Sequence, residues 1–178
     1  MIATKGQSGA RAMLRVLGAM GVEAIFASPG SEWSPVWEAL AAPAEPGSRI
    51  PQSQSSRHEE IAVAMASGYA KATGKLPAVM IHTTVGALHA SMAMRAALHE
   101  QIPMVVLVGE SIGFGEEPGP DPAPWWLGQL SDIGGPARLV QHCVKWGMGL
   151  NARTTLPAMI QRACQVAMAS PRGPVFLS

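Results

Sequence analysis

Short apolar segments alternate with helical segments along most of this 178-residue chain. The clearest apolar segment, Met104–Val108, contains no polar residue, which is typical of a strand buried on both faces of a parallel sheet. The residue pattern predicts further strands at 24–27, 49–55, 77–81 and 173–178, and helices at 8–20, 36–40, 58–73, 86–98 and 155–169. Because right-handed crossovers place helices on both faces of such a sheet, we expect a three-layer α/β/α domain with a mainly parallel sheet.

The composition is that of one well-packed domain, with 48% hydrophobic and 14% charged residues. The net charge of +1 and the single tyrosine, Tyr69, lack the basic stripe and the stacking side chains of a nucleic-acid binder. Neither a membrane-spanning run nor a secretion signal is recognisable, so we expect a cytoplasmic protein with no membrane partner. Cys143 and Cys164 lie in apolar stretches, which favours reduced, buried thiols.

Residues 109–113, with the sequence G-E-S-I-G, match the G-x-S-x-G motif of serine hydrolases. Ser111 would be the nucleophile, and Asp121 or Asp132 and then His142 follow in hydrolase order. The motif needs a helix directly after the serine, whereas residues 114–119 are rich in glycine and end in proline and glycine. We therefore favour an exposed irregular loop over 109–124 and keep a serine hydrolase as an alternative.

The histidines and glycines give no local signature of a metal or dinucleotide site. The five histidines lack H-x-x-x-H or Cys/His ligand spacing, so we expect no metal site built by this chain. The glycines between 109 and 119 do not form G-x-G-x-x-G, and dinucleotide binding is disfavoured.

Glu59 has two interpretations. Residues 56–59, with the sequence S-R-H-E, form an S-x-x-E capping box at the start of a predicted helix, which is a purely structural role. The second interpretation is chemical. Apolar residues surround most of this helix, so we expect it to be buried on most sides and to end at Gly74. Its carboxylate enters beside the polar ends of two strands, residues 28–31 and 82–86. Ligands of open parallel sheets bind at the carboxyl ends of the strands.

Four separate motifs in this chain resemble the N-terminal domain of thiamine diphosphate enzymes, which include acetolactate synthases, benzoylformate decarboxylases and pyruvate decarboxylases. The motifs cover residues 26–31, 57–59 with 68–74, 101–109 and 173–175. Their order and spacing extend the resemblance over nearly the whole chain. It implies that residues 1–178 form a pyrimidine-binding domain with the thiamine diphosphate-binding fold, and that the central and pyrophosphate-binding domains are absent from this chain.

The resemblance implies roles for the residues at the strand ends. Glu59 would hydrogen-bond the aminopyrimidine ring of the cofactor and activate it. Pro29 and Gly30 match a tight turn beside that ring, and Ser31 matches a position that faces substrate. For Ser31, an ordinary strand-to-helix turn remains an equal alternative.

The resemblance also assigns His82 to proton transfer, as in the decarboxylases, and Val85, Gly86 and His89 to cofactor contacts. Residues 84–88, T-V-G-A-L, are closer to the G-V-G-A-L of pyruvate decarboxylases than to the G-P-G-A-T-N of the synthases. The substrate would be a small 2-keto acid, and the choice between decarboxylation and carboligation stays open.

The family holds Mg²⁺ and the diphosphate on a second domain, through a G-D-G motif and an asparagine. This chain has no G-D-G; its only aspartates are Asp121 and Asp132, and its only asparagine is Asn151. The resemblance therefore implies Mg²⁺ ligands outside this chain, from a pyrophosphate-binding domain of the same or another chain, in a homo-oligomer (dimer or tetramer). The isolated chain would be inactive. Two alternatives are a small subunit of a two-chain sulfopyruvate- or phosphonopyruvate-type decarboxylase and a non-catalytic regulatory domain.

Overall fold

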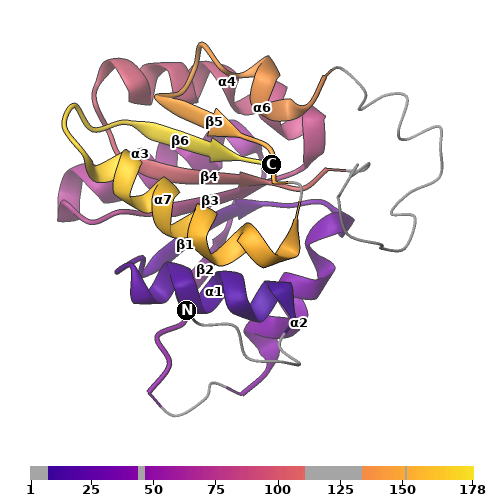
Figure 1. The fold of residues 1–178 in the computed structure, drawn as a ribbon. Helices are drawn as coiled ribbons and strands as arrows, with labels where there is room; N and C mark the ends of the chain where they lie inside the picture. Colours follow the sequence, from indigo (N-terminus) through magenta and orange to yellow (C-terminus); the bar gives the residue numbers. More distant parts are fainter. Residues whose placement is uncertain (1–7, 44–46, 111–133, 151) are drawn as a thin grey trace.

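The computed structural model describes residues 8–43, 47–110, 134–150 and 152–178. Its strands form one six-stranded sheet in the order β2-β1-β3-β4-β6-β5, and every neighbouring pair is parallel (Figure 1). In chain order the strands are β1 Ala24–Ser28, β2 Gln52–Ser55, β3 Ala78–Ile81, β4 Met104–Val108, β5 Trp146–Met148 and β6 Pro174–Leu177. The predicted α/β class and parallel sheet are confirmed.

Helices cover both faces of the sheet, as Figure 1 shows. One face carries α1 Gly9–Ala19, α2 Ser34–Ala41 and α7 Leu156–Met168. The opposite face carries α3 Glu59–Thr73, α4 Thr83–His99 and the short α6 Pro136–Leu139. Two 3-10 turns, η1 Ser31–Trp33 and η2 Arg153–Thr155, lead into α2 and α7. The predicted three layers are therefore present.

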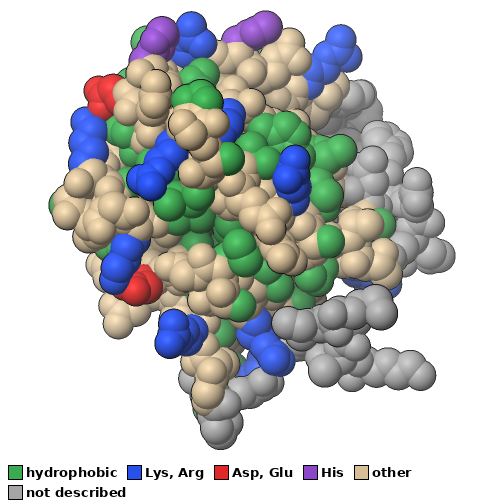
Figure 2. Space-filling model, turned by 60° about the vertical axis from the view of Figure 1, so that its left-hand side comes forward, with side chains coloured by type: hydrophobic (Ala, Val, Ile, Leu, Met, Phe, Trp, Pro, Cys, Tyr) green, Lys and Arg blue, Asp and Glu red, His purple; other side chains and the backbone are tan. Residues whose placement is uncertain are grey.

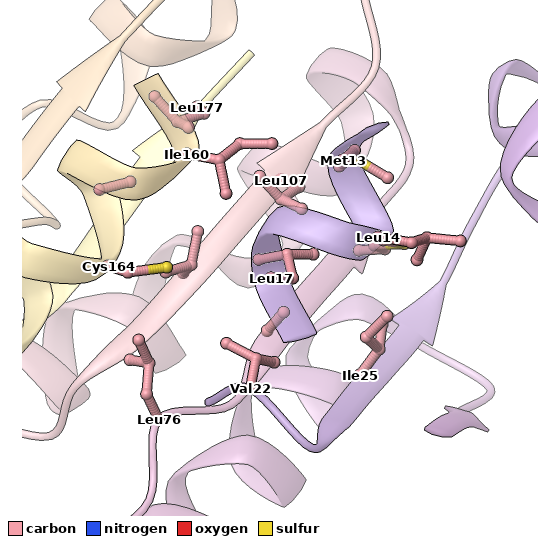
Figure 3. Packing of buried hydrophobic residues seen from close by; sticks show 14 of the residues in the cluster. Met13, Leu14, Leu17, Val22, Ile25, Leu76, Leu107, Ile160, Cys164 and Leu177 are labelled. Atoms are coloured by element: carbon pink, nitrogen blue, oxygen red, sulfur yellow. The ribbon is translucent and has the colours of Figure 1, made fainter. Parts of the chain in front are cut away.

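The core consists of two apolar layers, one on each side of the sheet. In β3, Ala78 and Met80 join the layer under α1 and α7, whereas Val79 and Ile81 join the layer under α3 and α4. This alternation follows from the two-residue repeat of a strand. All residues of β3 and β4 are buried, which explains their unbroken apolar sequence. Figure 3 shows the first layer, where side chains of α1 and α7 lie over the strands.

Several helix boundaries follow the expected local signals. The Ser8 hydroxyl caps α1 by accepting from the Arg11 amide, at 3.3 Å. Gly21 and Gly74 end the turns after α1 and α3 with φ angles of +84° and +71°, a conformation that favours glycine. Helix α4 starts at Thr83, earlier than the predicted Gly86, because Thr83 and Thr84 are buried in the helix rather than lying in a polar loop.

Two expectations about α3 are wrong. The N-cap is His58, whose Nδ1 accepts from the Glu60 amide at 3.3 Å, and not Ser56. The Ser56 hydroxyl instead donates to the carbonyl oxygens of Ala27 and His58, at 3.3 and 3.0 Å, so the capping box does not form. The helix is also not buried on most sides, since Ile61 is 48% exposed.

Short elements and the surface complete the domain. The residue pattern does not predict β5 or α6, because three or four residues are too few to show a period. Both cysteines are free; Cys164 is buried and Cys143 is half-buried. No helix in the described ranges combines the length and apolarity needed to cross a membrane. On the face drawn in Figure 2, Lys and Arg side chains are dispersed among hydrophobic and neutral ones.

Candidate active site

The predicted site residues gather at one edge of the sheet, where the strands end. Pro29 and Gly30 follow β1, and His82 follows β3. Glu59 is the first residue of α3, and α4 begins directly after His82. Strands β1 and β3 are adjacent and parallel, so their carboxyl ends lie side by side. The structure therefore brings together residues that are more than 50 positions apart in the sequence.

Glu59 is a buried carboxylate held between two helices. It is only 8% exposed, and its Oε2 lies 3.2 Å from Nδ1 of His89 on α4. An ionised carboxylate only accepts, so the His89 Nδ1–H donates this bond. A Cβ on Gly86 would lie 3.2 Å from the Glu59 Cγ and 3.3 Å from its Oε1. Glycine at this position therefore provides the space that the carboxylate occupies.

His58, Glu59 and His89 also form a cluster of potential metal ligands. One ligand atom from each lies within 4.8 Å of the others, and the two imidazole rings stack with their centroids 4.8 Å apart. Local spacing could not reveal this trio, because His89 lies 30 residues from Glu59. The Nδ1 of His58 accepts from the Glu60 amide, which places the ring proton on Nε2, the atom that faces Glu59 at 4.0 Å. Metal binding through Nε2 would require this proton to be lost and the cap to be rearranged.

His82 makes its closest polar contact with Glu32, a residue that sequence analysis missed. The two carboxylate oxygens of Glu32 lie 2.9 and 2.8 Å from Nδ1 of His82. Oε1 also accepts from the Thr83 amide at 3.4 Å. The Glu32 side chain is 15% exposed and that of His82 is 39% exposed. An acidic residue beside the S-P-G-S turn, at the carboxyl edge of the sheet, was the available signal for this pair.

Two glycines and a tryptophan shape the surroundings of the Glu32–His82 pair. A Cβ on Gly30 would overlap Nδ1 of His82 and Oε2 of Glu32, and a Cβ on Gly109 would overlap Cγ of Glu32. The indole Nε1–H of buried Trp33 donates to the Ile81 carbonyl at 2.9 Å. This bond ties the η1 turn to the end of β3 and so fixes Glu32 beside His82.

The other candidate residues lie at the margin of the site or outside the described residues. Ser31 is exposed at the start of η1, and its carbonyl oxygen accepts from the Ser34 hydroxyl at 2.6 Å. Val85 is 41% exposed in the first turn of α4. The hydrolase candidates Ser111, Asp121 and Asp132 lie outside the described residues, and His142 is exposed beside Gln141.

Five exposed apolar side chains lie on α3 and α4, the two helices that carry Glu59 and His89 and that cover the same face of the sheet: Ile61, Met65, Val85, Leu88 and Met92. Met92 is the most exposed of them, at 71%. Contiguous exposed apolar side chains can mark a surface that binds a protein, a membrane or a ligand. We call these five residues the α3–α4 strip.

Residues 7–113 match the family model for the thiamine pyrophosphate enzyme N-terminal TPP binding domain, where TPP is another name for thiamine diphosphate. The match covers more than half of the chain. The chain belongs to this family. The recognition made from the four motifs is therefore confirmed, and both Glu59 and the Glu32–His82 pair lie within the matched part of this TPP binding domain.

Curated relatives of the TPP binding domain are acetolactate synthases. The mitochondrial acetolactate synthase catalytic subunit of Aspergillus candidus is 30% identical over 174 residues, which are 97% of this chain and 23% of that protein. The acetolactate synthase isozyme 3 large subunit of Escherichia coli K12 is 34% identical over 103 residues, 58% of this chain and 17% of that subunit. The chain thus spans about a quarter or less of the length of these relatives.

Solved structures show the same fold. A thiamine diphosphate-dependent 4-hydroxybenzoylformate decarboxylase from Rhodococcus jostii RHA1 aligns with a TM-score of 0.77 at 23% identity, over 97% of this chain and 30% of that one. A putative thiamin diphosphate-dependent enzyme from Mycobacterium smegmatis aligns with a TM-score of 0.76 at 27% identity, over 97% and 30% of the two chains. These matches confirm the predicted thiamine diphosphate-binding fold.

Proposed function

We propose that this chain is the pyrimidine-binding domain of a thiamine diphosphate-dependent 2-keto acid decarboxylase or carboligase, and that Glu59 activates the cofactor. The observation that carries the proposal is the position of Glu59. Its buried carboxylate stands at the carboxyl edge of the sheet, in space left by Gly86, at the start of a helix that also exposes apolar side chains. A carboxylate with these surroundings suits a flat, largely apolar ring that needs one strong hydrogen bond.

The residues at the site fit the pyrimidine end of the cofactor. When bound, thiamine diphosphate supplies the electron sink for cleaving the bond next to the keto group of a 2-keto acid. Glu59 would hold a proton at a ring nitrogen, and His89 would keep its carboxylate in place. Pro29, Gly30 and Val85 would offer backbone and apolar surface to the ring. These assignments rest on family membership together with the geometry described above.

His82 and Ser31 are proposed to face the substrate rather than the ring. His82 would exchange a proton with the reacting molecule, and the exposed Ser31 would contact a small 2-keto acid. General acid–base transfer by a histidine contributes about 10²- to 10⁴-fold to a rate.

The α3–α4 strip supports a partner that completes the site. A pyrophosphate-binding domain that packed on the strip would cover its apolar side chains and lie directly beside Glu59. We propose that this domain, from the same or another chain of a homo-oligomer, supplies the Mg²⁺ ligands. On this proposal residues 1–178 are one domain of a larger active unit and are inactive alone.

The test is the substitution Glu59→Gln in the enzyme assembled with its pyrophosphate-binding domain. We expect turnover of a 2-keto acid to fall by about 100-fold or more, because the amide cannot take up the proton. Glu60→Gln is the matched control, since the neighbouring Glu60 is exposed. Isothermal titration with thiamine diphosphate and Mg²⁺ would show whether the Gln variant still assembles. Unchanged turnover in Glu59→Gln would refute the proposal.

The same titration separates the remaining alternatives. A small subunit of a two-chain decarboxylase would gain cofactor binding only when a separate pyrophosphate-binding chain is added. A fragment of a longer chain would need the rest of its own polypeptide. A regulatory domain would assemble with its partner but give identical cofactor binding in the wild type and in Glu59→Gln.

A further inference from the structure

We propose that Glu32 is a positioning residue that fixes the tautomer of His82, so that Nε2 is the nitrogen presented for proton transfer. This inference rests on the proposed function for the role of His82 in the reaction. The pairing itself rests on the geometry of the described residues. It defines a second acid–base centre beside Glu59, built from different strands and a different turn.

The geometry of the pair determines where the ring proton lies. Both oxygens of Glu32 are within hydrogen-bonding distance of Nδ1 of His82, at 2.9 and 2.8 Å. An ionised carboxylate has no proton to donate, so Nδ1 must carry the hydrogen. The neutral ring then has its lone pair on Nε2. A carboxylate on one ring nitrogen is a common way to set the tautomer and orientation of a working histidine.

The surroundings show that this pair has a dedicated space. Among the glycines that the structure describes, a methyl group would overlap the pair at Gly30, in the turn after β1, and at Gly109, directly after β4. Trp33 holds the intervening turn through its bond to the Ile81 carbonyl. Three separate strand ends therefore shape the space that one carboxylate and one imidazole fill.

A purely structural role for Glu32 makes different predictions. Its Oε1 also accepts from the Thr83 amide at 3.4 Å, so the carboxylate sits at the N-terminus of α4, where the helix dipole favours a negative charge. If helix capping were its only function, removal of Glu32 would lower stability. It would not change the tautomer of His82, and its effect on kcat would simply add to the effect of a His82 substitution.

The first test is nitrogen-15 NMR of the histidine rings in the 178-residue chain. In the wild type we expect His82 to show a protonated Nδ1 and an unprotonated Nε2. In Glu32→Ala we expect the His82 signals to move toward the Nε2–H form, with the other histidines unchanged. Glu38→Gln on the exposed side of α2 is the matched control. A wild-type His82 with its proton on Nε2 would overturn the proposal without any variant.

The second test is a double-mutant cycle in the assembled enzyme. Glu32→Gln should lower kcat by about 10- to 100-fold, with a smaller change in KM, because the amide no longer dictates the tautomer. In a His82→Asn background the same change should have no further effect on kcat. Additive losses in the cycle would show that Glu32 acts only on the fold.

The outcomes separate this inference from the proposed function. If Glu59→Gln keeps full turnover, the proposed function fails, while the NMR result on His82 still decides the tautomer. If Glu59→Gln abolishes turnover but Glu32→Gln leaves kcat unchanged, the role of Glu32 alone is refuted.

Discussion

The contact between Gly86 and Glu59 gives a prediction whose size follows from the structure. In Gly86→Ala, the new methyl group would lie 3.2 Å from the Glu59 Cγ, 3.3 Å from its Oε1 and 3.4 Å from the Ile81 carbonyl carbon. The Ile81 contact is with backbone, so the methyl group cannot retreat in that direction. The Glu59 side chain must then move by a few tenths of an ångström.

Two effects of opposite sign determine the stability of this variant. Alanine is better than glycine inside a helix by about 0.5–1 kcal/mol. Overpacking a filled site costs about 1–3 kcal/mol. The bond from His89 to Glu59 is already long at 3.2 Å, so a small shift of the carboxylate would weaken it as well. The steric effect should win, and we expect a net destabilisation of about 1–2 kcal/mol.

Urea unfolding would give the change in unfolding free energy for Gly86→Ala and for Gly68→Ala. The difference between the two changes measures the steric effect at Gly86. Gly68 is also inside a helix, but a Cβ there meets nothing within 4 Å. Gly68→Ala should therefore stabilise the chain by about 0.5–1 kcal/mol, through helix propensity alone. In the assembled enzyme, Gly86→Ala should also weaken thiamine diphosphate binding, because the displaced Glu59 carboxylate would meet the ring less well; each 1.4 kcal/mol of binding free energy lost is about tenfold in Kd. If both variants stabilise the chain equally, the close packing of Gly86 on Glu59 is wrong.

Two further predictions concern the α3–α4 strip and the buried thiol. Met92→Lys should weaken association with the pyrophosphate-binding domain at least tenfold in a titration, whereas Met148→Lys, on the edge strand β5, should not; equal effects would exclude the strip as the interface. Burial raises the pKa of the Cys164 thiol from 9.0 to about 12, so the unfolded chain loses this proton first and stability should fall as the pH rises through this window. Relative to Cys164→Ala, the wild type should lose about 2 kcal/mol of unfolding free energy between roughly pH 8 and pH 10.5, and a constant difference would contradict the buried thiol.

Much of the fold could be predicted because its local and long-range signals agree. The unbroken apolar run of β4 could be stable only between two helical layers, and Gly74 marked the end of α3. The errors occurred where a tertiary contact overrode a local rule. Ser56 matched a capping box, but its hydroxyl bonds to the carbonyl of Ala27 on β1, and His58 takes over the cap. Such a contact between distant segments leaves no local pattern.

The site was predictable in its location but not in its pairings. Ligands of open parallel sheets bind at the carboxyl ends of the strands, and this rule predicts Gly30, Glu59 and His82 at one edge of the sheet. It could not show that His82 pairs with Glu32 while Glu59 pairs with His89. Each pair joins residues 30 or more positions apart, and the choice between them depends on rotamers and on the space left by glycines.

The exposed apolar side of α3, where we expected burial, is relevant to function. The sequence of α3 is apolar around most of its circumference, and from this we expected burial within the chain. The structure buries only the sheet-facing side and leaves Ile61 and Met65 in solvent, 48% and 37% exposed. Helix α3 therefore has apolar side chains on two sides, and its own chain covers only one of them. Because Glu59 begins this same helix, a partner that covered the exposed face would lie close to the carboxylate, and assembly and cofactor activation would then depend on one surface.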